Sequence, residues 1–223
     1  MKTEPVRIAA AGATIDGELV LPEAPAGVVL FAHGSGSSRH SPRNRFVAAR
    51  LQEVRLATLL IDLLTPEEDR DYERRFDIGL LTERLEASAR WLARDRRTGA
   101  LPLGLFGAST GAAAALQLAA SMPDAVAAVV SRGGRPDLAG ELALGAVRAP
   151  VLLIVGGNDD VVIELNEAAL ARMHCPARIE IVPGATHLFE EPGTLEQVAD
   201  LAADWLRRHL GAPAAPGPSL SPA

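Results

Sequence analysis

Residues 101–116 read LPLGLFGASTGAAAAL and place a serine between an apolar run and an alanine-rich segment. The run 101–106 has the length and apolar character of a strand buried on both faces, and 110–121 has the composition of a helix. Between them, residues 107–111 form the pattern G-x-S-x-G with Ser109 at its centre. A serine on a tight strand-to-helix turn needs small neighbours, and these glycines provide them. The stretch predicts a nucleophilic serine; the alternative is an ordinary glycine turn whose serine is hydrogen-bonded.

Short apolar runs alternate with longer amphipathic segments along the rest of the chain. Strand-like runs lie at 6–10, 17–21, 27–32, 56–64, 101–106, 125–130, 151–155 and 177–182, and the first two are expected to form a hairpin. Helices are expected at 43–53, 78–97, 110–121, 137–147, 163–174 and 194–210. This alternation predicts an α/β fold with a parallel sheet and right-handed crossovers. In such sheets, ligands bind at the carboxyl ends of the strands.

The composition is that of one ordinary globular domain. The chain has 223 residues, of which 48% are hydrophobic and 22% charged, so we expect a single domain over residues 1–210. The segment 211–223 (GAPAAPGPSLSPA) carries no charged side chain and is expected to be a disordered tail. With a net charge of −6, nothing in the bulk charge suggests binding to nucleic acid or to an anionic membrane.

The sequence also bears on location and on disulfides. Cys175 is the only cysteine, so no intrachain disulfide can form. The first residues lack the apolar core of a signal peptide, and no apolar run approaches the roughly 20 residues that a membrane-spanning helix needs. We therefore expect a cytoplasmic protein.

A serine hydroxyl is a weak nucleophile until a nearby base accepts its proton. Of the five histidines, His187 in GATHLF directly follows the last strand-like run, and we predict it to be the general base. The others lie at helix ends, on the last helix or in the loop after 27–32. A histidine base needs a carboxylate that orients it.

That carboxylate is expected from GGNDDVV, which follows the strand-like run 151–155 and offers Asp159 and Asp160. The spacing G-x-x-D-x-x-V favours Asp159, with Asp160 as the second choice. Alternatively, both acids belong to a solvated turn that caps the next helix. The order Ser109, Asp159, His187, with each residue just after a strand, is the order of an α/β-hydrolase triad.

Together these motifs resemble the α/β-hydrolase superfamily and, within it, the small lidless dienelactone-hydrolase-like branch. The resemblance covers about residues 5–210 and rests on FAHGSG, FGASTG, GGNDDVV and GATHLF. It implies a mostly parallel sheet of about seven to eight strands with helices on both faces. No lid domain is expected, because only about 20 residues separate 125–130 from 151–155. Dienelactone hydrolases proper carry a cysteine nucleophile where this chain has Ser109.

The resemblance implies a serine hydrolase that acts on a carboxylic ester, lactone or thioester through an acyl-enzyme. The backbone N–H groups of Thr110 and Ser35 would bind the oxyanion, with Gly36 as the second choice for the latter. A thioesterase, peptidase or acyltransferase on the same triad stays open, as do a catalytically silent binding protein and anion binding by the loop 33–44 alone. No metal or organic cofactor is expected, because the sequence lacks HExxH, clustered Cys and His, and a P-loop.

Four arginines in strand-end loops raise a further hypothesis about the small-molecule substrate. Arg39, Arg43, Arg132 and Arg135 stand out in a net-acidic protein, and one or two of them would favour an anionic substrate. The alternative is that they are solvated or pair with the acids of PEEDRDYERRFD, residues 66–77. The sequence predicts neither the placement of this charged segment nor the oligomeric state.

Overall fold

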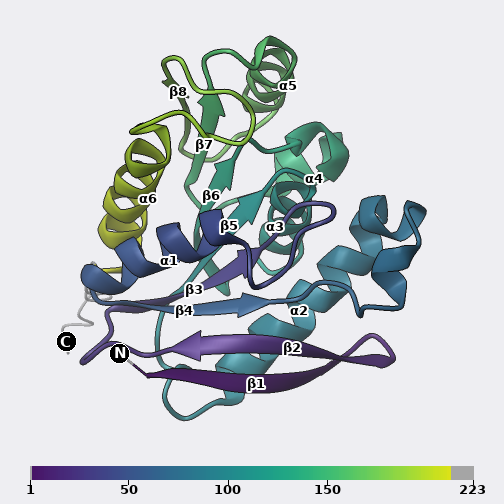
Figure 1. Cartoon of the computed structure of the whole chain (residues 1–223), viewed down its shortest axis with the longest axis vertical. Helices are drawn as coiled ribbons and strands as arrows, with labels where there is room; N and C mark the ends of the chain where they lie inside the picture. Colours follow the sequence, from purple (N-terminus) through teal and green to yellow (C-terminus); the bar gives the residue numbers. More distant parts are fainter. Residues whose placement is uncertain (1, 212–223) are drawn as a thin grey trace, which may run out of the picture.

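The computed structural model describes residues 2–211, so the predicted disorder of 212–223 lies outside the described residues. Eight strands form one sheet: β1 (Thr3–Ala10), β2 (Ala13–Val20), β3 (Gly27–Ala32), β4 (Leu56–Ile61), β5 (Leu103–Ala108), β6 (Val126–Arg132), β7 (Val151–Gly156) and β8 (Ala177–Val182). Their order in the sheet is β1-β2-β4-β3-β5-β6-β7-β8 (Figure 1). β2 pairs antiparallel with β1 and β4, and every other pair is parallel. The predicted mostly parallel α/β sheet is confirmed.

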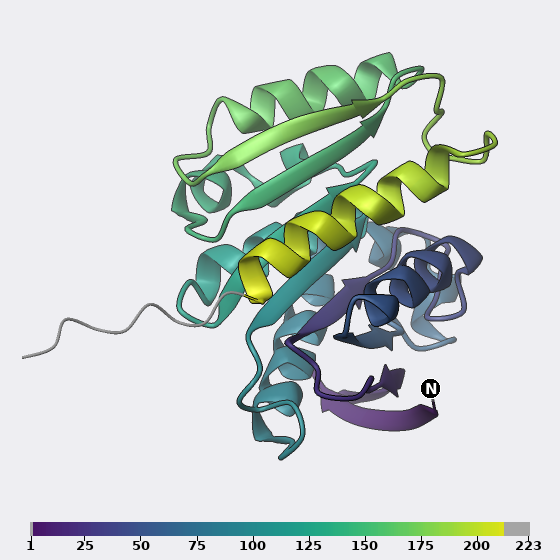
Figure 2. The same cartoon turned by 90° about the vertical axis from the view of Figure 1, so that its left-hand side faces the viewer.

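Among the described residues, six α-helices cover both faces of this sheet: α1 (Pro42–Glu53), α2 (Ile78–Arg94), α3 (Thr110–Ser121), α4 (Glu141–Ala146), α5 (Asp160–Leu170) and α6 (Thr194–Leu210). Three short 3₁₀ helices accompany them: η1 (Glu68–Arg70), η2 (Glu73–Phe76) and η3 (Pro136–Ala139). α1 and α6 pack together on one face, and α2 to α5 lie on the other (Figure 2). Only η3 and α4 lie between β6 and β7, which leaves no room for a lid domain.

The central strands are the most deeply buried part of the fold. Every residue of β3, β4, β5 and β7 is buried, as expected for parallel strands covered on both faces. Within residues 2–211, no helix is long and apolar enough to cross a membrane.

Several elements differ from their predicted bounds, among them β5, the helix predicted at 137–147 and α5. β5 runs from Leu103 to Ala108, two residues later than expected, because residues 98–101 form a turn and Ala108 pairs with Arg132 on β6. The predicted helix 137–147 is interrupted at Gly140, whose φ of 85° separates η3 from α4. α5 begins at Asp160 rather than at 163 and ends at Leu170, four residues early.

Candidate active site

Ser109 stands at the end of β5, on the turn that leads into α3. Its φ of 50° and ψ of −121° are strained for a side-chain-bearing residue, a state that costs on the order of 1–3 kcal/mol. The flanking glycines allow this turn: a Cβ on Gly107 would lie 2.4 Å from the Ala112 Cα, and one on Gly111 would lie 2.4 Å from the Ala32 carbonyl oxygen. The sequence therefore folds here into a strained turn that half-exposes the serine.

Asp159 and His187 meet although 28 residues separate them. The His187 Nδ1 lies 2.7 Å from Asp159 Oδ2, and the two side chains are 38% and 17% exposed. Their loops are tied together, because the Asn158 N–H donates to the Ala185 carbonyl over 2.9 Å. Asp160, the second choice for the acid, is instead the exposed first residue of α5.

The nucleophile turn and the histidine loop are joined through the end of β6. The Ser109 N–H donates to the Arg132 carbonyl over 3.3 Å. The next residue, Gly133, lies against the histidine: a Cβ there would be 3.1 Å from the His187 carbonyl oxygen and 3.6 Å from its ring Cε1. All three predicted triad residues therefore gather at the carboxyl edge of the sheet, on the loops after β5, β7 and β8.

The loop after β3 supplies the second predicted oxyanion donor. A Cβ on Gly34 would lie 3.0 Å from the Ser109 Cβ, so this loop touches the nucleophile. Within residues 2–211, the N–H groups of Ser35 and Thr110 have no hydrogen-bond acceptor, and both residues line one small cavity of about 10 Å³. Gly36, the second choice, lines the same cavity.

His33 fixes the direction of the Gly34–Ser35 peptide. The Leu63 N–H donates to His33 Nε2 over 2.9 Å, so the ring proton is on Nδ1, which donates to the Gly34 carbonyl over 2.9 Å. In a trans peptide the C=O and N–H point in opposite directions, so the Ser35 N–H points away from His33. Burial lowers the pKa of His33, which favours the neutral ring that this bonding needs.

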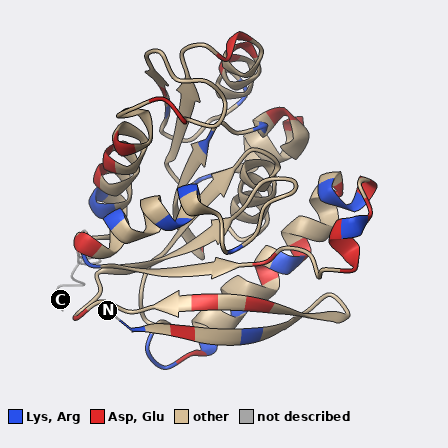
Figure 3. Ribbon diagram, in the orientation of Figure 1, with Lys and Arg blue, Asp and Glu red and all other residues tan. Residues whose placement is uncertain are grey.

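The charged segment 65–77 lies beside the oxyanion loop and carries both signs of charge (Figure 3). Asp69 and Arg75 line the same small cavity as Ser35. Arg75 is held in place because its Nε donates to the Asp69 carbonyl over 2.8 Å, and a Cβ on Gly36 would be 3.7 Å from Arg75 Nη1. This segment therefore forms one wall of the candidate active site.

The four predicted arginines fall into two groups. The Arg39 guanidinium pairs with Asp62, and Arg135 holds both carboxylate oxygens of Asp137, at 2.9 and 2.7 Å. Arg43 has one partner, Glu190, at 3.1 Å. Arg132 has none among the described residues. The predicted anionic substrate remains a prediction for all four.

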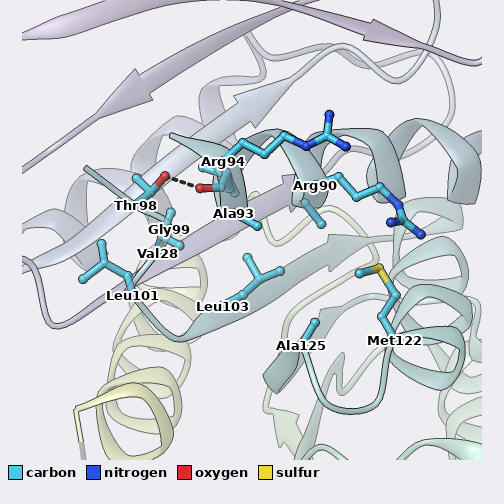
Figure 4. A pocket seen from close by; sticks show the side chains of 12 residues that line it. Val28, Arg90, Ala93, Arg94, Thr98, Gly99, Leu101, Leu103, Met122 and Ala125 are labelled. Atoms are coloured by element: carbon cyan, nitrogen blue, oxygen red, sulfur yellow. Dashed lines mark hydrogen bonds between the residues drawn. The ribbon is translucent and has the colours of Figure 1, made fainter. Parts of the chain in front are cut away.

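A larger cavity, of about 350 Å³, lies near the amino ends of the parallel strands, against α2 (Figure 4). Val28 and Leu103, at the starts of β3 and β5, line it, and Arg90 and Arg94 of α2 stand over it. None of the predicted catalytic residues lines this cavity. Among residues 2–211, no three His, Cys, Asp or Glu side chains gather into a possible metal cage.

Sequence reasoning missed three contributors to this site. The sequence predicts His33 only as a loop residue, although its position directly before Gly34 in FAHGSG indicates a role in orienting that loop. Phe189, with a φ of 56°, packs against Arg132, with the guanidinium carbon 6.0 Å from the ring centroid. Gly133, with a φ of 49°, lets the histidine loop approach β6. The last two have no sign in the local sequence, because they depend on contacts between distant segments.

Comparison with known proteins agrees with this architecture. The sequence matches the dienelactone hydrolase family over residues 17–210. The solved structure of a dienelactone hydrolase from Anabaena variabilis ATCC 29413 is 54% identical, with a TM-score of 0.90 over 94% of this chain and 98% of that chain. A lidless α/β serine hydrolase from Xanthomonas campestris has a TM-score of 0.77 at 21% identity, over 95% of this chain and 97% of that chain, and shows the shared fold.

A longer relative comes from Mycobacterium tuberculosis and bears the name "Putative phosphoribosyl transferase". It is 58% identical over 219 residues, which make up 98% of this chain and 48% of that relative. The chain thus spans about half the length of this curated relative. On the family match and the Anabaena structure together, the chain belongs to the dienelactone hydrolase family.

Proposed function

We propose that the protein is a serine hydrolase that cleaves a carboxylic ester, lactone or thioester with Ser109, His187 and Asp159. One observation carries the proposal: the 2.7 Å contact between His187 and Asp159 lies at the same carboxyl ends of the strands as a serine on a strained, glycine-flanked turn. Strained backbone conformations cluster at active sites, and a nucleophilic serine needs an adjacent base that a third group orients.

In the proposed mechanism each member has its own role. Asp159 accepts a hydrogen bond from the Nδ1–H group of His187, which leaves the lone pair of the neutral ring on Nε2. Nε2 then takes the proton of the Ser109 hydroxyl as Oγ attacks the substrate carbonyl carbon. The same proton passes to the leaving group, and the C–O or C–S bond breaks to give an acyl-serine. Water, deprotonated by His187, releases the acid and regenerates the serine.

Charge that develops on the carbonyl oxygen needs donors that are already oriented. The N–H groups of Thr110 and Ser35 suit this need, since neither has an acceptor within residues 2–211 and both residues border one cavity. One such donor contributes about 3 kcal/mol to the transition state. Thr110 is also the first residue of α3, so the partial positive charge of the helix N-terminus adds to its effect.

A fluorophosphonate tests the proposal directly. Wild-type protein should be labelled at Ser109, and Ser109→Ala should abolish labelling and lower kcat by about 10⁶-fold. His187→Ala should do nearly as much, because the two residues act as a unit. Wild-type protein that resists labelling, or a Ser109→Ala variant that is still labelled, would refute the assignment and leave a silent binding protein.

A panel of p-nitrophenyl esters and matched acyl thioesters of increasing chain length separates esterase from thioesterase activity. We do not propose phosphoribosyl transfer for this chain, although the name of the M. tuberculosis relative suggests that activity for the relative. About half of that relative has no counterpart in this chain, and the strand-end loops here present a serine and an imidazole.

A further inference from the structure

Arg132 is a buried cation that has no protein counter-ion among residues 2–211. It is 7% exposed, and its Nε and Nη1 atoms are fully enclosed without any acceptor in the part of the chain that the structure describes. Nη2 is the one guanidinium nitrogen that is not fully enclosed, and it has no protein acceptor within residues 2–211 either. Such a group is costly, because a charge removed from water is normally paired.

Arginine cannot avoid this cost by losing its proton at neutral pH. Burial, and secondarily the nearby charge of Arg43, lower the pKa of Arg132 to about 10, which still leaves the guanidinium charged. Phe189 offsets only part of the cost, since its ring centroid lies 6.0 Å from the guanidinium carbon. The positive charge of the partly exposed Arg43 nearby makes this arrangement less favourable still, unless an anion lies between the two guanidinium groups.

Arg43, in the first turn of α1, also has a guanidinium nitrogen without a hydrogen-bond acceptor among residues 2–211. In the part of the chain that the structure describes, its Nε is enclosed without an acceptor, and its only carboxylate partner is the exposed Glu190. Two further acids near these strand ends are already engaged, since Asp62 holds Arg39 and Asp137 holds Arg135. Two cations therefore converge here with fewer protein anions than they could bind.

The place of Arg132 connects it with catalysis. Its carbonyl accepts the Ser109 N–H, and the residue that follows it lies against His187. Its guanidinium packs against Phe189, which lies two residues after His187 on the histidine loop. We propose that Arg132, assisted by Arg43, binds an anionic group of the substrate, a carboxylate or a phosphate, beside the scissile bond; this rests on the proposed hydrolase function.

The test compares charged and neutral members of matched substrate pairs. For the acyl side we would use p-nitrophenyl hydrogen succinate and its methyl ester, and for the leaving-group side 4-acetoxybenzoate and its methyl ester. Methyl 4-acetoxybenzoate also serves as the neutral partner of 4-acetoxyphenyl phosphate. Comparing this phosphate with 4-acetoxybenzoate separates a preference for phosphate from one for carboxylate. Wild-type kcat/KM should favour the charged member of at least one pair by about tenfold or more.

Arg132→Met should remove this preference, and Arg132→Lys, which keeps the charge but loses the planar fork, should retain part of it. Arg94→Met, a matched loss of one positive charge near the amino ends of the parallel strands, should leave the preference unchanged. Equal ratios in wild type and Arg132→Met for every pair would overturn the subsite. So would an equal loss in Arg94→Met, which would indicate a general charge effect.

A binding measurement keeps the subsite separate from the hydrolase assignment. Sodium benzoate and inorganic phosphate, added singly, should raise the Tm of wild type and of Ser109→Ala but not that of Arg132→Met. If fluorophosphonate labelling fails while this difference persists, the hydrolase proposal falls and the anion site stands. If labelling succeeds while neither anion discriminates between wild type and Arg132→Met, and no substrate preference depends on Arg132, only the anion site falls.

Discussion

Two arginines of this protein are almost fully buried, yet their surroundings differ. Arg84 on α2 is 1% exposed, and its guanidinium pairs with Glu68 at 2.7 Å and donates to the Ala10 carbonyl. Arg132 on β6 lies on the opposite face of the sheet and has no such partner within residues 2–211. The first cation ties the β1–β2 hairpin and the charged segment to α2. The second stabilises nothing that the structure shows, which is the reason to look for its partner in a ligand.

Of the substitutions that test this contrast, one at Arg84 should change the free energy of unfolding most. Arg84→Met should lower the free energy of unfolding by about 3 kcal/mol, because it leaves Glu68 without its buried partner. Urea denaturation followed by circular dichroism measures the change. Arg74→Met is the matched control, since Arg74 reaches the same carboxylate at 3.4 Å from an exposed position and should cost less than about 0.5 kcal/mol. Equal losses in the two variants would contradict the structural role of Arg84.

His33 sharpens the comparison because, unlike an arginine, it can shed its proton. Its folded-state pKa lies below the ordinary value of 6.5, so the unfolded chain binds more protons as the pH falls past 6.5. Its contribution to stability is therefore complete above pH 6.5 and is lost at lower pH, by up to about 1.4 kcal/mol per pH unit.

The measurement is the free energy of unfolding in urea at pH 7, 6 and 5, for wild type and His33→Gln. The variant should show a shallower decline with falling pH, because glutamine does not titrate. Identical slopes in the two proteins would mean that other groups cause the whole acid sensitivity.

The smallest expected effect has the opposite sign. Arg132→Met should raise the free energy of unfolding by about 1 kcal/mol, because it replaces an unpaired buried charge with an apolar chain of similar length. Urea denaturation again reports it. A loss of 2 kcal/mol or more would place Arg132 with Arg84 among the structural cations and would remove the reason to seek an anion.

Much of the fold follows from local sequence, because buried parallel strands and amphipathic helices have distinct patterns. The bounds of β3, β8, α3 and α6 coincide with the predicted runs. β5 does not, because its last residues are strand only through pairing with β6. Gly140 ends η3 through a backbone angle that composition does not encode.

The candidate site divides in the same way. The residue types and chain order of Ser109, Asp159 and His187 can be predicted from the sequence. Each residue follows a strand, and the loops after parallel strands lie together at the carboxyl ends of the sheet. Which arginines are paired with a carboxylate cannot be predicted from the sequence, because their partners can lie far away along the chain. Arg39, for example, pairs with Asp62, 23 residues later. Whether a buried charge is paired is a property of packing, and no local pattern reports it.

Helix α3 has a consequence for the response to salt. Its first turns are fully buried, so the partial charge at its N-terminus acts through protein rather than through solvent. Dissolved ions, which screen over about 8 Å at physiological strength, cannot surround it. Arg43, 31% exposed, is open to them. Ionic strength should therefore weaken the capture of an anionic substrate while leaving the acyl-transfer step almost untouched.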